Sequence, residues 1–482
     1  MAETQPLLGV SDTSMRSSPF ADFKLSSFLR FIGPGFMIGV GYLDPGNWAT
    51  DLAAGSQFGY SLLYIILVSS SMATVLQYLC IKLGVVTGLD LAMACKKHFS
   101  PTVNIALFII CELAIIATDL AEVIGTAIAL NLLFDLPLGW GVAVTSLDVI
   151  VILSFWGAKH LKQFEAAMAI LVGLVGVCFV YLLAVSQPDW VQVAWGFVPS
   201  SDIIKVDGQL YIAVSIIGAT IMPHNLYLHS SIVRYRSSTT STQLGEVSEL
   251  LESSDEPDNG AISVQPSQRS TLIPESLKYS NMDSIFALIF ALLINSAILI
   301  VAASAFTGEG EVAEIKDAYV LLRKHLGPAA GYAFAFALFC AGQSSTITGT
   351  LTGQIVTEGF TNIKFTPYLQ RLGTRLLAIV PAMIAALFSG ASGMNHLLVF
   401  SQVILSLQLP FAIWPLIWIT CGASTGNAMK VCFLDHHDDE EDSGGDSTIV
   451  DYVNSPVLIV SSVVIGVFIT IFNVILLFQM IF

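Results

Sequence analysis

The sequence predicts an all-α, polytopic membrane protein, and three observations support this class. First, 54% of the 482 residues are hydrophobic and only 12% are charged, a balance far from that of a soluble globular protein. Second, apolar runs of about 20 residues, the length that crosses the hydrocarbon core, occur eleven times. Third, the basic residues gather on one side of the predicted helices. The runs lie near residues 31–52, 60–83, 102–133, 138–156, 164–186, 209–233, 284–306, 328–357, 372–392, 396–421 and 456–481.

The distribution of Lys and Arg orients the helices. With the N-terminus inside, sixteen of the twenty basic residues fall in inner segments, including Arg371 and Arg375 near the start of the ninth run. Because Lys and Arg accumulate in cytoplasmic loops, we expect a cytoplasmic N-terminus. An odd number of helices then places the C-terminal end on the outer or lumenal face.

Three polar segments interrupt the apolar runs, and we expect all three in the cytoplasm. The first segment is rich in Ser, Thr and Pro, and the second is rich in Ser, Thr and acidic residues. Both compositions are typical of disordered segments. The third segment is acidic. The chain divides into a disordered tail (1–28), helices one to six (29–233), a disordered loop (234–283), helices seven to ten (284–423), an acidic loop (424–455) and helix eleven (456–482).

The net charge and the N-terminal tail indicate which partners the protein could bind. The net charge of −16 is concentrated in the two inner loops, which excludes nucleic acid because its partners need clustered basic charge. In the tail, Glu3, Leu7 and Leu8 resemble an acidic dileucine signal that sorting adaptors read. The alternative is a chance pair of leucines, so both an endosomal or vacuolar membrane and the plasma membrane stay open.

Two helix-breaking stretches interrupt apolar runs. One is GYLDPGN, beginning at Gly41, and the other is ATIMPHN, beginning at Ala219. Proline has no N–H for the carbonyl four residues back, so Pro45 frees the carbonyl of Gly41 and Pro223 frees that of Ala219. Two interrupted segments in matching places indicate the substrate site of a secondary transporter.

The polar groups at the two breaks indicate a divalent metal ion as the substrate. They are the carboxylate of Asp44, the amide of Asn47, the thioether of Met222 and the freed carbonyls of Gly41 and Ala219. Hard oxygens with one soft sulfur suit Mn²⁺ or Fe²⁺, whereas Mg²⁺ and Ca²⁺ prefer oxygen throughout. A methionine in an apolar helix is more often a packing residue, but the position of Met222 at a break favours a ligand.

Acidic residues on the third run indicate a proton path. Glu112, Asp119 and Glu122 share one face of a helix at ~100° per residue. His224 follows the second break, and because histidine changes charge near neutral pH, we interpret it as part of a proton relay. The alternative is that one or two of the acids pair with an inner arginine such as Arg371 and only hold helices together.

Four motifs together resemble those of the natural resistance-associated macrophage protein (Nramp) family of proton-coupled divalent metal transporters. They are DPGN at Asp44, MPHN at Met222, TDLAE at Thr118 and GQSS at Gly342. Stretches that begin at Leu79 and Glu122 look most similar to the fungal manganese transporters of the family. Many members have paired arginines at the start of helix nine, whereas here Gln370 precedes Arg371.

The resemblance implies a LeuT-like fold, with helices one to five and six to ten as inverted repeats and an eleventh helix added. It implies a metal site made of Asp44, Asn47, Met222 and the carbonyls of Gly41 and Ala219, joined during occlusion by Gln402 of helix ten. Gln77 and Asn295 match polar positions near the site, and we assign Gln343 to the pathway lining with them. The alternative for the small polar run around Gln343 is tight packing between helices. Proton transfer would involve Asp44, His224, Glu122, Asp119, Glu112 and Arg371.

We therefore expect a proton-coupled secondary transporter, not an enzyme, that imports Mn²⁺, with Fe²⁺ as a second substrate, by alternating access. We expect it to act as a monomer in the lipid bilayer without a resident cofactor. One alternative is a sodium-coupled amino-acid symporter on the same fold, although Asp44 would repel a substrate carboxylate. The other is a membrane metal-sensing scaffold that works through the acidic loops.

Overall fold

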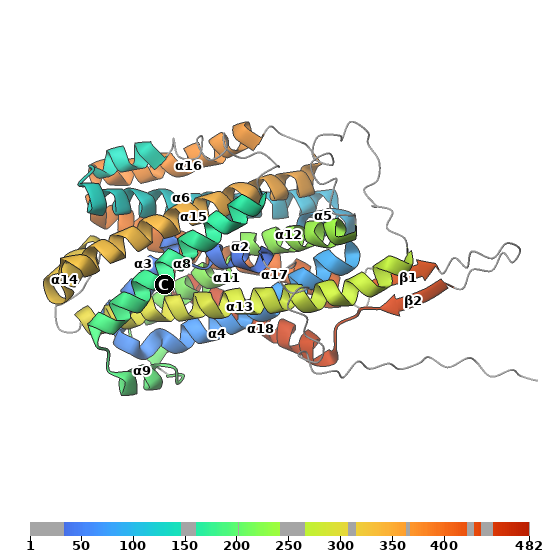
Figure 1. The fold of residues 1–482 in the computed structure, drawn as a ribbon, viewed down its shortest axis with the longest axis horizontal. Helices are drawn as coiled ribbons and strands as arrows, with labels where there is room; N and C mark the ends of the chain where they lie inside the picture. Colours follow the sequence, from blue (N-terminus) through green and yellow to red (C-terminus); the bar gives the residue numbers. More distant parts are fainter. Residues whose placement is uncertain are drawn as a thin grey trace, which may run out of the picture.

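The protein is seen in a computed structural model that describes residues 33–145, 161–200, 202–241, 266–306, 315–362, 367–421, 429–434 and 447–481. Nearly all of these residues are helical, and most of the long helices run along the longest axis of the molecule (Figure 1). The predicted all-α class is confirmed for the described residues, apart from one short pair of strands.

The element bounds follow the chain order. The first half contains α2 (Pro34–Gly41), α3 (Pro45–Phe58), the 3₁₀ helix η1 (Gly59–Leu62), α4 (Leu63–Thr87), α5 (Leu91–His98), α6 (Pro101–Phe134), α8 (Leu161–Ser186), α9 (Trp190–Gly196), α10 (Asp202–Lys205), α11 (Gln209–Ile221) and α12 (Pro223–Ser241). The second half contains α13 (Pro266–Phe306), α14 (Ile315–Leu326), α15 (Pro328–Thr361), α16 (Pro367–Phe388), α17 (Gly390–Cys421), β1 (Lys430–Leu434), β2 (Ser447–Asp451) and α18 (Pro456–Ile481).

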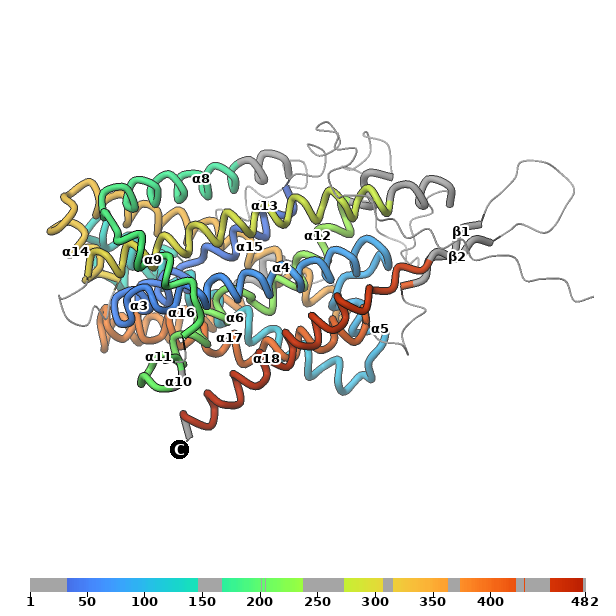
Figure 2. Tube along the Cα trace, turned by 90° about the horizontal axis from the view of Figure 1, so that it is seen from below, coloured from blue at the N-terminus to red at the C-terminus, as the bar shows by residue number. Residues whose placement is uncertain are grey.

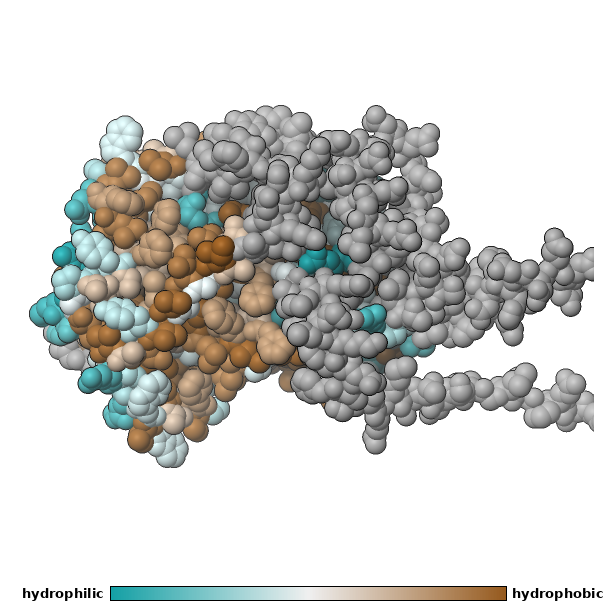
Figure 3. Space-filling view, viewed as in Figure 1, coloured by the Kyte–Doolittle hydropathy of each residue, from teal (hydrophilic) through white to brown (hydrophobic). Residues whose placement is uncertain are grey.

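Seven helical segments among the described residues are long and apolar enough to cross a membrane. The predicted run at 138–156 lies largely outside the described residues. Helix α15 covers the predicted run at 328–357 and contains the polar residues of that run. It packs against α6 and α8. Apolar side chains cover much of the described surface in Figure 3, with hydrophilic ones gathered toward its left edge. This surface suits a bilayer rather than water.

The two broken runs lie in the centre of the helix bundle. All residues between Gly33 and Gly55 except Phe36 are buried, and α13 packs along both α2 and α3. Helix α11 contacts α3, and α12 contacts α2, so the two breaks face each other. Helix α6 crosses the first break so closely that a side chain at Gly125 would collide with Pro45.

The helices extend further into the predicted loop at 234–283 than its composition indicates. Helix α12 continues to Ser241 and α13 begins at Pro266, so both ends of the predicted loop are helical in the structure. The physical reason is burial: Ile273 packs with Val233 and Met429 in a small apolar cluster. Met429 precedes β1, which pairs antiparallel with β2 inside the predicted acidic loop. The tail 1–28, with Glu3, Leu7 and Leu8, lies outside the described residues.

Candidate functional site

The first break places a carboxylate at the start of a helix. Helix α2 ends at Gly41 and α3 begins at Pro45, with Asp44 as its N-cap in extended conformation. Asp44 Oδ1 accepts hydrogen bonds from the backbone N–H of Asn47 at 2.9 Å and from Asn47 Nδ2 at 2.7 Å. The other oxygen, Oδ2, is buried and has no hydrogen-bond partner among the described residues. One oxygen therefore holds the helix end and the other is available to a ligand.

The second break holds a methionine in an unusual backbone conformation. Helix α11 ends at Ile221 and α12 begins at Pro223, with Met222 between them at a φ of 42°. Positive φ is uncommon for a residue with a side chain and costs about 1–3 kcal/mol. The Met222 N–H donates to the carbonyl of Gly218 at 3.2 Å, and the side chain is fully buried. The surrounding packing therefore holds the thioether at the break against a local energetic cost.

Asn47 joins the two breaks. The Asn47 Nδ2 group that donates to Asp44 Oδ1 also donates to the carbonyl of Ala219 at 3.0 Å. Pro223 leaves this carbonyl without its usual helical donor. A carboxylate oxygen from the first break and a backbone oxygen from the second thus converge on a single N–H₂ group.

Asn225 brings the remaining predicted ligands together. Its side chain lies against Gly41, where an added Cβ would be 2.5 Å from Asn225 Nδ2. The same nitrogen lies 3.6 Å from the sulfur of Met222. No group of three or more His, Cys, Asp or Glu suited to a metal ion occurs among the described residues. A metal site at the breaks would therefore depend on amide, carbonyl and thioether ligands beside a single carboxylate.

Helix α17 contributes Gln402 to the breaks. A side chain at Gly46, two residues after Asp44, would collide with the amide of Gln402, and one at Gly218 would collide with its backbone carbonyl. Gln402 is fully buried, and its Nε2 donates to Ser401 Oγ at 2.9 Å. Its Oε1 has no hydrogen-bond partner in the part of the chain that the structure describes. Two buried acceptors without donors, on Asp44 and Gln402, therefore accompany the first break.

Two of the three predicted pathway-lining residues hydrogen-bond to Tyr42, which lies in the first break. Gln77 Nε2 donates to the hydroxyl of Tyr42 at 2.8 Å, and Asn295 Nδ2 donates to the Tyr42 carbonyl at 3.0 Å. Gln77 Oε1 lies 2.6 Å from Nδ1 of His229. Gln343 is half-buried in α15. Gln77 and Asn295 thus contact the break through Tyr42, so their contacts position the chain between α2 and α3.

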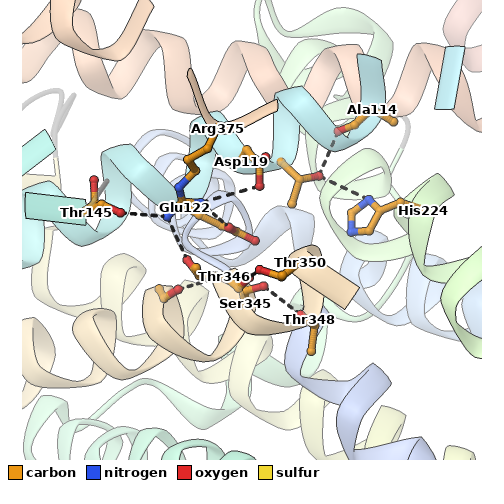
Figure 4. Close-up of polar contacts among 12 residues, drawn as sticks. Ala114, Asp119, Glu122, Thr145, His224, Ser345, Thr346, Thr348, Thr350 and Arg375 are labelled. Atoms are coloured by element: carbon orange, nitrogen blue, oxygen red, sulfur yellow. Dashed lines mark hydrogen bonds and ion pairs between the residues drawn. The ribbon is translucent and has the colours of Figure 1, made fainter. Parts of the chain in front are cut away.

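Two of the predicted proton-path acids form a buried ion pair with an arginine of α16 (Figure 4). Arg375 Nη1 of α16 lies 2.9 Å from Glu122 Oε2 and 3.6 Å from Asp119 Oδ1. Arg375 Nη2 also reaches Thr346 Oγ1 of α15 at 3.4 Å. The two acidic side chains are fully buried and Arg375 is 2% exposed. Charges this deep are costly unless paired, so the three groups form one electrostatic unit.

The other predicted proton-path residues lie on either side of this unit. His224 Nδ1 is 3.3 Å from Thr118 Oγ1, next to Asp119 in the chain, so α6 links the second break to the ion pair (Figure 4). Glu112 lies two turns earlier on α6 and accepts a hydrogen bond from Thr357 Oγ1 at 2.9 Å. The acidic face therefore divides into a buried part with an arginine and a half-buried part with a threonine.

The sequence does not predict the role of Arg375, the cation of this ion pair. By its position Arg375 counts as an inner-loop charge, and the predicted arginine is Arg371, one turn earlier on α16, whose side chain lies outside the described residues. An arginine within the apolar sequence of helix nine is itself the missed signal. Asp51 is a second buried acid on α3, one turn after Asn47, and its Oδ2 has no partner among the described residues.

A family model described as natural resistance-associated macrophage protein-like matches residues 35–430. The divalent metal cation transporter MntH of Listeria innocua is 46% identical over 480 residues, which cover 99% of this chain and 95% of that protein. MntH of a Nostoc species is 48% identical over 421 residues, covering 87% and 88%. These relatives are bacterial, so they do not support the particular likeness to fungal members.

Solved structures share the fold. A variant of the Eremococcus coleocola manganese transporter has a TM-score of 0.74 and 34% identity, covering 97% of this chain and 90% of that one. Mhp1, a nucleobase-cation-symport-1 family transporter, has a TM-score of 0.53 at 14% identity, covering 80% and 78%, and so shows likeness of fold alone. The predicted LeuT-like fold is confirmed by these neighbours.

Proposed function

The chain belongs to the natural resistance-associated macrophage protein (Nramp) family, and from this premise we propose that it imports Mn²⁺, with Fe²⁺ as a second substrate, into the cytosol. Protons moving in the same direction would drive transport, by alternating access around a site at the two helix breaks. The metal ion and the proton are substrates, so the proposal involves neither a resident cofactor nor an enzymatic reaction.

One observation carries the proposal: oxygens from both breaks converge on one positively polarised group. Asp44 Oδ1 and the Ala219 carbonyl share the N–H₂ of Asn47 as their donor. A divalent cation at this point would replace the N–H₂ as the partner of both oxygens. Asp44 Oδ2, which has no donor among the described residues, would supply a further negative contact.

The remaining ligands need only local movements. Rotation of the Asn47 amide would turn its oxygen toward the cation, because the side chain carries an acceptor as well as a donor. The thioether of Met222 and the backbone of Gly41 both lie against the side chain of Asn225. Gln402 would add its donorless Oε1. Mostly hard oxygens with one soft sulfur favour Mn²⁺ and Fe²⁺ over Mg²⁺ and Ca²⁺.

Proton coupling follows from electrostatics at the first break. A dication at Asp44 favours the ionised carboxylate, so metal arrival would displace a proton from it. His224 at the second break and the Asp119, Glu122 and Arg375 unit on and beside α6 offer the groups that would carry the proton onward. The Glu112 carboxylate would extend this route along the same helix.

The symporter alternative is disfavoured by the same geometry. In such a symporter the positive end of a half-helix holds the substrate carboxylate, but here Asp44 already caps α3. A second carboxylate would meet both an occupied helix end and a like charge. The metal-sensing scaffold rests on acidic runs that lie outside the described residues, and no described contact favours it.

The protein is an integral membrane protein, and we propose that it acts as a monomer with a cytoplasmic N-terminus. An endosomal or vacuolar membrane would follow if adaptors read the signal at Glu3, Leu7 and Leu8, and the plasma membrane if they do not. In either membrane the proposed direction of metal movement is into the cytosol.

Replacing Met222 with alanine should widen the ion selectivity while uptake continues. The substitution removes the one soft ligand that hard ions do not need, so we expect the preference for Mn²⁺ over Ca²⁺ to fall about tenfold, equivalent to ~1.4 kcal/mol. The measurement is uptake of Mn²⁺, Mg²⁺ and Ca²⁺ into proteoliposomes under an inward proton gradient.

Met394→Ala is the matched control for the selectivity test. It truncates an equally buried methionine, on α17 two turns before Gln402, and should leave the preference unchanged. Equal selectivity of the Met222→Ala variant and the unmodified chain would remove the thioether from the site.

A further inference from the structure

A buried asparagine of the eleventh helix, α18, makes two hydrogen bonds to α17. Asn473 Oδ1 accepts a hydrogen bond from Ser406 Oγ of α17 at 2.9 Å, and Asn473 Nδ2 donates to the Ser406 backbone carbonyl at 2.7 Å. The two residues are 4% and 1% exposed. Helix α18 packs along α17 and also touches α11 (Figure 2). One residue of α18 thus satisfies both polar groups of a single residue on α17.

A proline explains why this carbonyl needs an outside donor. Pro410 lies inside α17, four residues after Ser406. Because proline has no N–H, the Ser406 carbonyl loses its helical partner, and within a membrane such a freed group needs another partner, which a neighbouring helix can supply. Asn473 supplies the missing donor. Without it, the turn of α17 between Ser406 and Pro410 would lack one of its hydrogen bonds.

The turn that Asn473 secures packs directly on the site. An added Cβ at Gly218 would lie 2.7 Å from Ser406 N and 2.8 Å from Ser406 Cβ. Gly218 in turn accepts the hydrogen bond of the Met222 N–H. Gln402, one helical turn before Ser406, contacts both Gly218 and Gly46. A shift of the turn at Ser406 would therefore move Gln402 relative to both helix breaks.

We propose that Asn473 is a positioning residue for metal binding: it replaces the helical hydrogen bond that Pro410 removes and so holds Gln402 against the two breaks. The proposal rests on the function proposed above. It assigns to α18 a part in setting metal affinity, although α18 contributes no ligand.

The variants separate this role from general helix packing. Asn473→Leu removes both hydrogen bonds while keeping the size of the side chain, and Asn473→Ala removes them with a smaller side chain. The control Thr470→Val removes another hydrogen bond between α17 and α18, that from Trp414 Nε1 at 3.2 Å. Trp414 is 37% exposed and lies three turns from Gln402, so this control leaves the proline turn untouched.

The experiment measures the Mn²⁺ concentration dependence of uptake in proteoliposomes and, separately, Mn²⁺ binding to purified protein by calorimetry. We expect the KM and the Kd for Mn²⁺ to rise about tenfold for both Asn473 variants and to stay unchanged for Thr470→Val. In a Gln402→Ala background, Asn473→Leu should add no further loss, because both changes act through the same contact.

A suppressor gives a second, independent test. Pro410→Ala restores an N–H to α17, so the Ser406 carbonyl regains its helical donor and Asn473→Leu should become nearly harmless. Normal affinity of the Asn473 variants, losses that simply add to that of Gln402→Ala, or no relief by Pro410→Ala would each overturn the proposal. If the unmodified chain neither binds nor moves Mn²⁺, the proposed function itself fails, which is a distinct result.

Discussion

Asp44→Asn should abolish Mn²⁺ uptake, with a fall of at least about 100-fold, equivalent to ~2.8 kcal/mol. Asparagine keeps the size of the side chain and an oxygen that can cap α3, so the helix should form normally. It removes the negative charge that offsets a dication in a site without exposed solvent. Uptake into proteoliposomes and calorimetric Mn²⁺ binding should therefore fall together, while the unfolding temperature changes little.

Asp51→Asn is the matched control for this loss. It neutralises another buried carboxylate of α3, two turns beyond Asp44, and should reduce uptake far less. Equal losses in the two variants would show that buried negative charge on α3 matters generally. Full uptake by Asp44→Asn would remove Asp44 from the metal site.

Arg375→Met should both destabilise the protein and stop coupled proton movement. It leaves the buried carboxylates of Asp119 and Glu122 without their cation, and breaking a buried pair in this way costs about 3–5 kcal/mol. The acids would then retain their protons to avoid buried charge. Thermal unfolding should show the lost stability, and vesicle acidification during Mn²⁺ uptake should show the lost proton movement.

A neutral triple variant separates stability from coupling. Arg375→Met combined with Asp119→Asn and Glu122→Gln has no unpaired charge and should regain most of the stability, but not the acidification that accompanies Mn²⁺ entry. Normal acidification by this variant would mean that the ion pair only holds α6 and α16 together, the alternative reading of the acidic face of α6.

The positions of the two breaks could be predicted because their cause is local. A proline removes a hydrogen bond wherever it stands in a helix, so Pro45 and Pro223 mark the breaks without knowledge of the fold. The same rule applies to Pro410, but its outcome differs, since Asn473 fills the gap from 63 residues further along the chain. Whether a freed carbonyl faces a substrate or a neighbouring helix depends on packing, which the sequence does not reveal.

The choice between two arginines on one helix face also depends on packing. Arg371 and Arg375 are one turn apart on α16, and only the placement of α16 against α6 decides which one reaches Glu122. The polar composition of the loop before helix seven does not show that α13 extends into it, where Ile273 is buried beside Val233. The average composition of a segment does not show which of its individual residues pack against apolar side chains elsewhere in the fold.

Proton-coupled import of Mn²⁺ is tested most directly with the unmodified chain in proteoliposomes, by following Mn²⁺ entry and internal pH together. We expect Mn²⁺ uptake to rise under an inward proton gradient, and acidification of the vesicles to require Mn²⁺ and not to be supported by Mg²⁺ or Ca²⁺. Mn²⁺ entry that neither depends on the gradient nor carries protons would contradict coupling. Absence of any divalent ion movement in well-reconstituted vesicles would contradict metal transport itself.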